Sequence, residues 1–530
     1  MDGIQLPLEG SGFRSKLLND YLQGDDFLKQ FYAFRPELSS FGEAIASRKN
    51  FPVNRKVLVE ELKQQHKDFL DRFPEVAANV EALKSDATFT VSTGHQLCIA
   101  GGPLFFIYKI ITVINLAEEL RKKFPDCNFV PVYWMATEDH DFAEIAGLNV
   151  NGRELKWEHP ESGATGRMDT AGLDHFFSTV DELIRPLPGA EKLRNTFRSA
   201  YTSGSTLADA TRAFVLEFFG AKGLLVMDAD TPAFKQEFKA VIKDELQHES
   251  SFAAVNETDQ ILNTRYHTQV KPREINLFFL SENSRSRIVR TGSVYEVLNS
   301  KLKFSKEEIL SEVDNHPENF SPNVILRPVY QELLLPNLAY VGGPAETAYW
   351  FQFKKVFDHH KVFFPLLVPR NHAMILEPKP WKHWQKLGLG YAEIFVDRDQ
   401  LVNNVVKALS GNESVTAEAK LKLGAVYQTL LEQAGKTDVT LRPAVEAQLQ
   451  KTMRGLERIE KKHFSALKRK HELVIRHIDE MMELAKPGGI PQERVMSFVT
   501  LYAQHGDAVL DVLMNELVPF SDTFTVIHPH

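Results

Sequence analysis

The sequence predicts an α/β protein built on a doubly wound parallel sheet, with inserted connecting subdomains and a C-terminal antiparallel α-helical coiled coil. Two separate segments repeat the order strand, glycine-containing turn, helix and strand, which is typical of parallel sheets covered by helices. From about residue 413 onward, the pattern changes to long, charged helices. These observations predict one elaborated α/β core and one helical appendage.

The first repeated segment lies between residues 87 and 136. "ATFTVSTG" (87–94) has the pattern of a buried strand that ends in glycine. "NFVPVYWMA" (128–136) carries apolar residues on both faces, as strands of a helix-covered parallel sheet do. Between them we expect a helix with Pro103 as its first residue and with cations in its last turn, where they oppose the helix dipole.

The second repeated segment has the same order. "NLAYVGG" (337–343) predicts a strand, "PAETAYWFQFKKVFDHH" (344–360) a helix, and "VFFPLLVPR" (362–370) another strand. "KGLLVMDAD" (222–230) predicts a further strand of the same sheet. In doubly wound sheets, ligands bind at the carboxyl ends of the strands.

Insertions interrupt the predicted core, which spans residues 81–400. Residues 275–280 and 287–291 have the pattern of a hairpin, and residues 174–219 are mostly helical. We therefore expect inserted connecting subdomains at about 150–220 and 240–320, where they could cover a site.

The regions before and after the predicted core are expected to be mainly helical. Residues 1–80 form an N-terminal helical region, residues 413–486 a coiled-coil hairpin, and residues 487–530 a segment that returns to the core. The apolar residues of the longest helical pattern recur at spacings of three to five: Leu449, Met453, Leu456, Ile459, Phe464, Leu467, Leu473 and Ile478. The pattern leaves open whether the hairpin packs within one chain or between chains.

Composition excludes several classes of function. The formal net charge of -8 gives no basic field for nucleic acid. The apolar run at residues 104–117 is too short and too polar to cross a membrane. The chain has two cysteines, Cys98 and Cys127, and its first residues lack a signal-peptide pattern. We expect a cytoplasmic protein with neither a nucleic-acid nor a membrane partner.

The turn "GHQLCIAGG" after the first strand is the first candidate site. Gly94, Gly101 and Gly102 would let the backbone approach a ligand closely, and the following helix start would attract an anion. His95 and Gln96 lie beside it. The turn matches neither the P-loop nor the dinucleotide fingerprint, so it predicts only a nucleotide-class site. The alternative is a tight turn whose glycines serve packing, with His95 a surface histidine.

The sequence "TEDHD" follows the second strand and is the second candidate site. Glu138, Asp139, His140 and Asp141 would face the same crevice as His95. Such a cluster can bind an amine, hold Mg2+ or act as a general base. In a purely structural cluster, we would expect an adjacent cation to satisfy the carboxylates.

Two arginines near strand ends are candidate anion ligands. Arg327 precedes an apolar helix and Arg370 follows the last strand, and guanidinium groups bind carboxylates and phosphates bidentately. Either could instead pair with a nearby acid. Ser305 and Glu308 in "KFSKEE" favour a helix cap over a catalytic lysine loop. Cys98 has no basic neighbour in sequence and is not expected to act as a nucleophile.

Three longer segments are distinctive: "GHQLCIAGGPLFFIYKI", "VPVYWMATEDHDFAEI" and "FSPNVILRPVYQELLLPNLAYVGGPAETAYW"; in addition, "GGIPQERV" follows the coiled coil. Together they resemble the signature segments of the BshC family, the cysteine-adding enzymes of bacillithiol biosynthesis. The resemblance covers most of the chain. The family blocks correspond to Gly94, Gln96, Gly102, Pro103, Lys109, Glu138, Asp139, His140, Asp141, Glu144, Arg327, Gln331, Gly343, Pro344 and Trp350. His95 departs from the family pattern, in which glutamine can occupy this position.

The resemblance implies a Rossmann-like core with connecting insertions, a coiled coil that mediates homodimerisation, and a reaction that joins L-cysteine to glucosaminyl malate. The cysteine carboxylate must be activated, most simply by ATP, with or without Mg2+, as an acyl-adenylate or acyl-phosphate. No tightly bound cofactor is expected, and no residue is assigned as a metal ligand.

We expect the helix start at Gly101 and Gly102, together with Lys109, to stabilise phosphate or carboxylate charge. Arg327 or Arg370 would bind the malate carboxylates, and Asp139, His140 or Asp141 would take the ammonium proton. Two other functions remain open: a nucleotidyltransferase-like enzyme acting on another small substrate, and a nucleotide-binding coiled-coil scaffold for the pathway.

Overall fold

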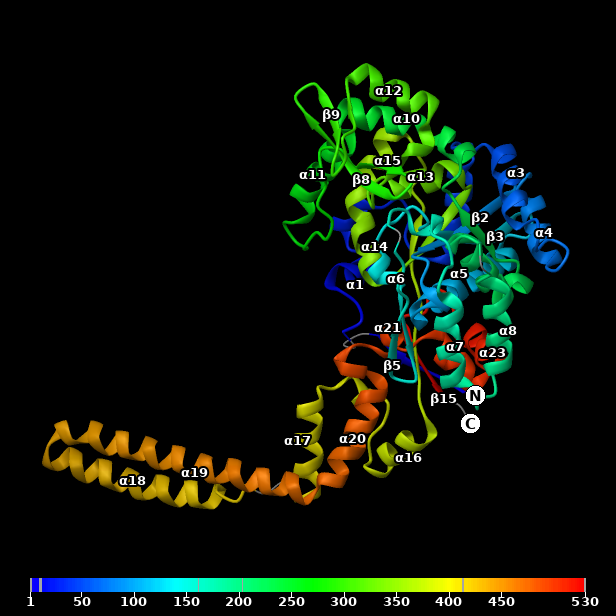
Figure 1. Ribbon diagram of the computed structural model, residues 1–530. Helices are drawn as coiled ribbons and strands as arrows, with labels where there is room; N and C mark the ends of the chain where they lie inside the picture. The colour runs from blue at the N-terminus through cyan, green and yellow to red at the C-terminus, as the bar shows by residue number, and fades with distance from the viewer. Residues whose placement is uncertain (1, 9–11, 161, 203, 412–413, 529–530) are drawn as a thin grey trace. The chain divides into compact units, whose positions relative to one another are not determined.

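The computed structural model describes residues 2–8, 12–160, 162–202, 204–411 and 414–528 (Figure 1). The chain divides into two compact units: Met1–Met374 with Gln492–Ile527, and Ile375–Pro491 with His528–His530. Among the described residues, no helix is both long enough and apolar enough to span a membrane.

A five-stranded parallel sheet forms the centre of the first unit. Its strands in chain order are β2 (Thr88–His95), β3 (Asn128–Met135), β6 (Leu225–Asp228), β12 (Asn337–Gly342) and β13 (Leu366–Pro369). They are arranged in the order β13-β12-β2-β3-β6, and every neighbouring pair is parallel. The first strand therefore lies at the centre, and the order reverses between β2 and β12. This topology confirms the predicted doubly wound sheet.

Helices cover both faces of this sheet. α5 (Leu104–Lys123) packs on β2 and β3, and its Phe106 contacts Tyr133. On the other face, Tyr330 of α13 (Arg327–Leu334) packs edge-on against Trp134. Every residue of β2 is buried, as expected of a central strand that is covered on both faces.

The start of α5 differs from the sequence prediction. Pro103 is the N-cap, with extended backbone, and the helix begins at Leu104. The Leu104 N–H donates to the carbonyl of Met496 at 3.0 Å, and the Phe498 N–H donates to the carbonyl of Gly102 at 2.9 Å. The C-terminal segment therefore covers this helix start, a long-range contact that the local pattern could not indicate.

Other elements surround the sheet. The N-terminal helices are α1 (Lys16–Gln23), α2 (Phe41–Arg48), α3 (Arg55–His66) and α4 (Pro74–Ala82). The first insertion holds α6 (Phe142–Ile145), the hairpin β4 (Gly147–Val150) and β5 (Arg153–Lys156), and helices α7 (Leu173–Ile184), α8 (Ala190–Ala200) and α9 (Leu207–Phe219). Between β12 and β13 lie α14 (Pro344–Trp350) and α15 (Lys354–His360).

The second insertion contains three helices and an antiparallel sheet. Its elements are α10 (Pro232–His248), α11 (Ser250–Leu262), β7 (Leu277–Ser281), β8 (Ser284–Thr291), β9 (Val294–Val297), β10 (Lys303–Phe304), α12 (Lys306–Asn315) and β11 (Phe320–Pro322). β7 and β8 form the predicted hairpin. The predicted capping box of α12 is also confirmed, because Ser305 accepts from the Glu308 N–H and the Glu308 carboxylate accepts from the Ser305 N–H.

The C-terminal segment ties the two ends of the chain to the first unit. It holds α21 (Gln492–Val495), α22 (Phe498–His505), α23 (Asp507–Glu516) and β15 (Thr523–His528), and β15 pairs between β1 (Asp2–Pro7) and β14 (His372–Ile375). Arg370 forms a buried bidentate ion pair with Glu493, with nitrogen–oxygen distances of 2.5 and 3.0 Å. Arg370 therefore pairs with an acidic side chain, which was the alternative to its predicted role as a ligand for a substrate anion.

The second unit is helical. Its elements are α16 (Pro378–Lys386), α17 (Arg398–Leu409), α18 (Ala417–Thr437), α19 (Arg442–Lys470) and α20 (Glu472–Ala485). α18 and α19 pair antiparallel within the chain, as the contacts Tyr427–Thr452 and Lys420–Glu460 show. This pairing confirms the predicted coiled-coil hairpin. The unit starts before residue 413, because α16 and α17 pack on α20.

Replacing Arg370 with Met is expected to lower the free energy of unfolding by about 3–5 kcal/mol, because Glu493 would remain buried without a full partner. Although burial alone would raise the pKa of Glu493, Arg370 and His372 hold it well below its ordinary value. The pair therefore stabilises the fold above the ordinary glutamate pKa, and this contribution is lost as the pH falls. Chemical unfolding followed across acid pH measures both effects.

The matched control is Arg398→Met. Arg398 pairs with Asp479, and both side chains are 45% exposed, so its loss should cost only about 0–1 kcal/mol. Equal destabilisation by the two variants would contradict the structural role of the Arg370–Glu493 pair.

Candidate active site

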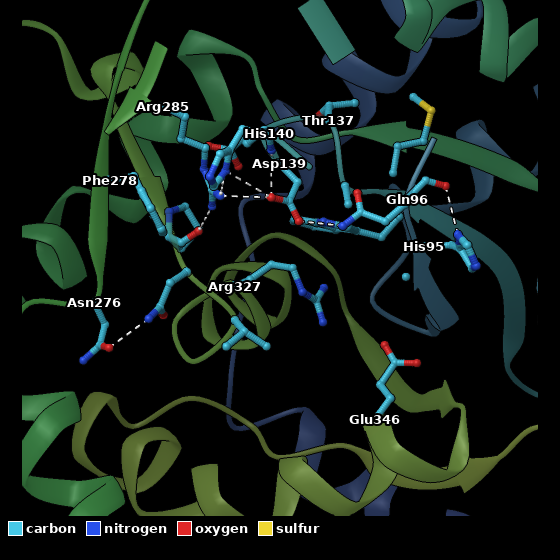
Figure 2. Close-up of a pocket in the computed structure, with 18 of the residues that line it drawn as sticks. His95, Gln96, Thr137, Asp139, His140, Asn276, Phe278, Arg285, Arg327 and Glu346 are labelled. Atoms are coloured by element: carbon cyan, nitrogen blue, oxygen red, sulfur yellow. Dashed lines mark hydrogen bonds and ion pairs between the residues drawn. The ribbon is translucent and has the colours of Figure 1, made fainter. Parts of the chain in front are cut away.

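A cavity of about 590 Å³ lies at the carboxyl ends of β2, β3 and β12. The core lines one side of it, including residues 94–96 and 134–140, and the second insertion lines the other with side chains between residues 271 and 287. Figure 2 shows side chains from both sides pointing toward a shared space. The cavity therefore lies where the strand order reverses, the position at which doubly wound sheets bind ligands.

Four residues connect the two halves of the sheet at this point. Lys109 of α5 donates to the carbonyl of Gly94 at 2.7 Å and pairs with Glu346 of α14 at 2.5 Å. The Tyr340 hydroxyl of β12 donates to Glu346 and accepts from the Gly94 N–H at 3.2 Å. A Cβ on Gly94 would lie 2.8 Å from the Tyr340 oxygen, so only glycine fits there. The network joins the first βα unit to the fourth strand.

Charge within this network is balanced. Burial lowers the pKa of Lys109, while Glu346 opposes that effect. Burial alone would raise the pKa of Glu346, but Lys109 holds it below its ordinary value. Both side chains are largely buried, and together they carry no net charge. Lys109 lines the cavity, as expected, but its charge is already compensated.

Arg327 is the candidate cation that the structure leaves without an acidic partner. Its guanidinium donates to the Gln331 side-chain oxygen at 3.1 Å and to the Tyr340 hydroxyl at 3.4 Å, and no carboxylate among the described residues pairs with it. Gln331 is buried and donates in turn to Ser92 and Glu332. Gln331 thus positions Arg327, whose side chain points into the cavity in Figure 2.

Asp139 is held on several sides. Gln96 donates to one carboxylate oxygen at 2.5 Å, and Arg285 at 3.1 Å and the His140 N–H at 2.8 Å donate to the other. Burial alone would raise the pKa of Asp139, but Arg285 and these hydrogen bonds lower it below its ordinary value. Asp139 therefore stays ionised and is a weak proton acceptor.

Glu138 and Asp141 have structural partners. Glu138 forms an ion pair with the fully buried Lys235 of α10, which is the adjacent cation expected of a structural carboxylate. Asp141 accepts from the Glu144 N–H as the N-cap of α6, and it does not line the cavity. The expectation that all four residues of the 138–141 cluster face the crevice is therefore corrected for Asp141.

Both candidate histidines line the cavity. The Nδ1 of His140 accepts from Arg285 at 3.1 Å, and its ring packs on Phe278. His95 is not a surface residue: its Nδ1 donates to the Gln96 carbonyl at 2.9 Å, and its ring lies between Phe105 and Phe106. Burial lowers the pKa of His95 to about 3, so the ring is neutral near pH 7.

Glu144 is the lining carboxylate without an ion pair among the described residues. Burial raises its pKa, and the nearby negative charges of Asp141 and Asp139 add to this effect. A carboxylate with a raised pKa is better suited to accept a proton near neutral pH. Glu144 was identified from the sequence only through the family resemblance.

Several cations of the cavity were missed by the sequence reasoning. Arg285 of β8 pairs with Asp139 and stacks over Phe278 at 4.0 Å. Lys271, Arg273 and Arg287 also line the cavity and have no carboxylate partner among the described side chains. No local pattern distinguishes them from solvent-exposed cations of an insertion.

The remaining sequence candidates lie outside the lining. Gly101 and Gly102 have φ of 79° and 54°, and Gly102 packs against Cys98, so the expectation that they approach a ligand is corrected to a packing role. The Gly343 N–H donates to Glu346 at 3.1 Å, and Trp350 stacks on Tyr340 at 4.4 Å. These two residues position the network around Tyr340.

Cys98 is buried next to this turn. Burial raises the pKa of its thiol to about 12, so the reactive thiolate is not available near neutral pH. This state agrees with the expectation that Cys98 is not a nucleophile.

Comparison with known proteins identifies the family. Residues 1–371 match the description "Bacillithiol biosynthesis BshC, N-terminal Rossmann-like domain", and residues 373–529 match "Bacillithiol biosynthesis BshC, C-terminal coiled-coil domain". Relatives from Flavobacterium psychrophilum and Flavobacterium johnsoniae are each 40% identical, with 98% of both chains covered. A relative from Chloroherpeton thalassium is 30% identical, with 96% of both chains covered. All three are named "Putative cysteine ligase BshC". The chain belongs to the BshC family of bacillithiol biosynthesis.

Proposed function

We propose that this protein is a cysteine ligase that joins the carboxyl group of L-cysteine to the amine of glucosaminyl malate, with ATP activating the carboxylate. The relatives are named cysteine ligases, which supports the proposal that this protein is a ligase. The observation that carries the proposal is the cavity at the strand-order reversal, in which four cations lack an acidic partner among the described residues: Lys271, Arg273, Arg287 and Arg327.

The charges of the proposed substrates match this cavity. Its lining has six lysine and arginine side chains and four carboxylates, and two of the cations are already paired with two of the carboxylates. Lys235, which lies outside the lining, compensates a third carboxylate. The free cations can therefore bind the two malate carboxylates and the phosphates of ATP, because guanidinium groups hold both bidentately.

The reaction has two steps. An oxygen of the cysteine carboxylate attacks a phosphorus atom of ATP and releases pyrophosphate or ADP, which leaves an acyl-adenylate or acyl-phosphate. The glucosamine nitrogen then attacks the carbonyl carbon, loses a proton, and displaces AMP or phosphate. Arg327 lies at the strand-order reversal, where it can stabilise charge on the group that leaves.

Glu144 is the proposed proton acceptor in the second step. It lines the cavity without an ion pair among the described residues, and burial together with the charges of Asp141 and Asp139 raises its pKa. Asp139, held by Gln96 and Arg285, keeps its pKa low and instead positions Arg285. The acceptor nitrogen of His140 is already occupied by Arg285.

Any Mg2+ would arrive with the nucleotide. The two groups of metal-ligating side chains found among the described residues lie away from this cavity. We place the reaction in the cytoplasm, a reducing compartment in which both cysteines and the cysteinyl product keep free thiols.

The direct test is mass spectrometry of the purified protein with cysteine, glucosaminyl malate, ATP and Mg2+, with each component omitted in turn. Cysteinyl product that requires ATP supports the ligase. Nucleotide transferred to the acceptor without an amide bond would support the nucleotidyltransferase alternative. ATP binding by folded protein without any product would support the scaffold alternative.

Replacing Glu144 with Gln should lower kcat by about 10²–10⁴-fold, because a general base is lost. In the unmodified protein, activity should fall as the pH drops through the raised pKa of Glu144, and this acidic limb should be absent from the variant. Steady-state kinetics across pH measures both effects. Glu154→Gln, on the outward hairpin β4–β5 and outside the lining, is the control. An unchanged kcat in the Glu144 variant would exclude it as the base.

Replacing Arg273 or Arg287 with Met should raise KM for ATP or for glucosaminyl malate by about 10-fold or more each, because a hydrogen bond to a charged group contributes about 1.5–3 kcal/mol. Arg290→Met is the control, since Arg290 lies on the same strand as Arg287 but pairs with Glu249 outside the lining. An equal effect of all three substitutions would indicate general electrostatics instead of specific contacts.

We also propose that the hairpin of α18 and α19 forms a homodimer. No described residue of α19 is buried, and Leu421 and Val426 of α18 and Ile459 of α19 are 76%, 54% and 55% exposed. Apolar side chains exposed at helical spacing are typical of an interaction surface. A second copy of the hairpin would cover them.

The double substitution Leu421→Lys and Ile459→Lys should convert a dimer to a monomer without loss of helix. Light scattering with circular dichroism measures both properties. Thr429→Lys, an exposed polar position of α18, should leave the dimer intact. A dimer that persists in the double variant would place the interface elsewhere.

A further inference from the structure

Three potential metal ligands lie together at the ends of two helices, away from the cavity. Asp244 belongs to α10, and His359 and His360 are the last two residues of α15. One ligand atom of each residue lies within 4.8 Å of the other two. Helix α11, which follows α10, packs on α15, and Figure 1 shows the three helices in one region of the first unit.

The arrangement of the rings suits convergence on one ion. The rings of His359 and His360 are 4.8 Å apart at an angle of 88°, so their nitrogens can point at a common centre from different directions. The His359 Nε2 lies 2.8 Å from one Asp244 oxygen, and the His248 Nδ1 lies 3.0 Å from the other. The carboxylate is thus fixed in place at the edge of the cluster.

A second observation, at His360, supports this site. The Nε2 of His360 is buried and has no hydrogen-bond partner in the part of the chain that the structure describes. Buried polar atoms are normally hydrogen-bonded, so this nitrogen is available to a further partner. Neither His359 nor Asp244 satisfies this atom through a hydrogen bond, but an ion between the three residues would.

We propose that Asp244, His359 and His360 bind a divalent ion of the Zn2+ class. Imidazole nitrogens together with one carboxylate oxygen form a common Zn2+ ligand set, and a fourth position is filled by water or by a neighbouring imidazole. His248, already hydrogen-bonded to Asp244, would orient that carboxylate from outside the ligand set.

The ion would clamp α10 to α15, two helices that are each connected to residues of the cavity lining. α10 carries Lys235, the partner of Glu138, and α15 follows α14, which carries Glu346. The site is therefore a structural clamp at a distance from the reacting groups. It does not depend on the ligase proposal, because none of its residues lines the cavity.

The chain contains an internal control. His383, His477 and Glu480 also lie within 4.8 Å of one another, but the two rings are stacked at 3.9 Å and 24°. Nearly parallel stacked rings direct their lone pairs side by side instead of toward one centre. We expect this second group to bind Zn2+ much more weakly.

The test uses the full-length protein stripped with chelator and titrated with Co2+ and then with Zn2+. The visible Co2+ absorption and calorimetry give the ligand set and the stoichiometry. We expect one ion per chain, a rise in Tm with Zn2+, and at least about tenfold weaker binding in Asp244→Asn and His359→Ala. His383→Ala should bind as the unmodified protein does, and circular dichroism confirms that each variant is folded.

Two results would overturn the proposal. One is the absence of any Co2+ spectrum or Zn2+-dependent Tm shift in the folded, unmodified protein. The other is binding that survives in both Asp244→Asn and His359→Ala but is lost in His383→Ala, which would assign the ion to the stacked group.

Discussion

The buried ion pair between Lys109 and Glu346 is the constraint on which the site depends. Lys109 belongs to the helix after the first strand, Glu346 to the helix after the fourth, and the strand order reverses between these two strands. Their contact, together with hydrogen bonds to Gly94 from Lys109 and to Tyr340 from Gly94, connects the two halves of the sheet at this point. Because breaking a buried pair costs several kcal/mol, the floor of the cavity is held in one geometry. The other lining side chains are therefore positioned around a rigid floor.

The core and the second insertion contribute different properties to the cavity. The core supplies the floor, on which Lys109 and Glu346 compensate each other and Gln331 positions the unpaired Arg327. The insertion supplies charge, because Lys271, Arg273 and Arg287 carry no acidic partner among the described residues. Arg285 joins the two parts through Asp139. This division explains how an acidic protein with a net charge of -8 can present a cationic pocket to polyanionic substrates.

The local sequence pattern predicted the main helices and strands, but it predicted only part of the site. The strands, α5 and the coiled-coil hairpin follow from the spacing of apolar residues, and the parallel-sheet rule placed Gly94, Gln96 and Asp139 at one edge. The C-terminal segment contacts three of the candidates from more than a hundred residues away in the sequence. Phe498 lies beside Gly101 and donates a hydrogen bond to the Gly102 carbonyl, and Glu493 pairs with Arg370. Arg285 reaches Asp139 only through the folding of the insertion. Long-range contacts of this kind cannot be predicted from the local sequence pattern.

The proposed function depends on activation of the cysteine carboxylate by ATP. The most direct measurement is a reaction with L-cysteine labelled with oxygen-18 in both carboxylate oxygens, followed by mass spectrometry of the nucleotide and phosphate products. If ATP activates the carboxylate, one labelled oxygen is expected in AMP or in phosphate for each amide formed, because the amine displaces AMP or phosphate together with one carboxylate oxygen. Amide product accompanied by unlabelled AMP and phosphate would contradict this activation.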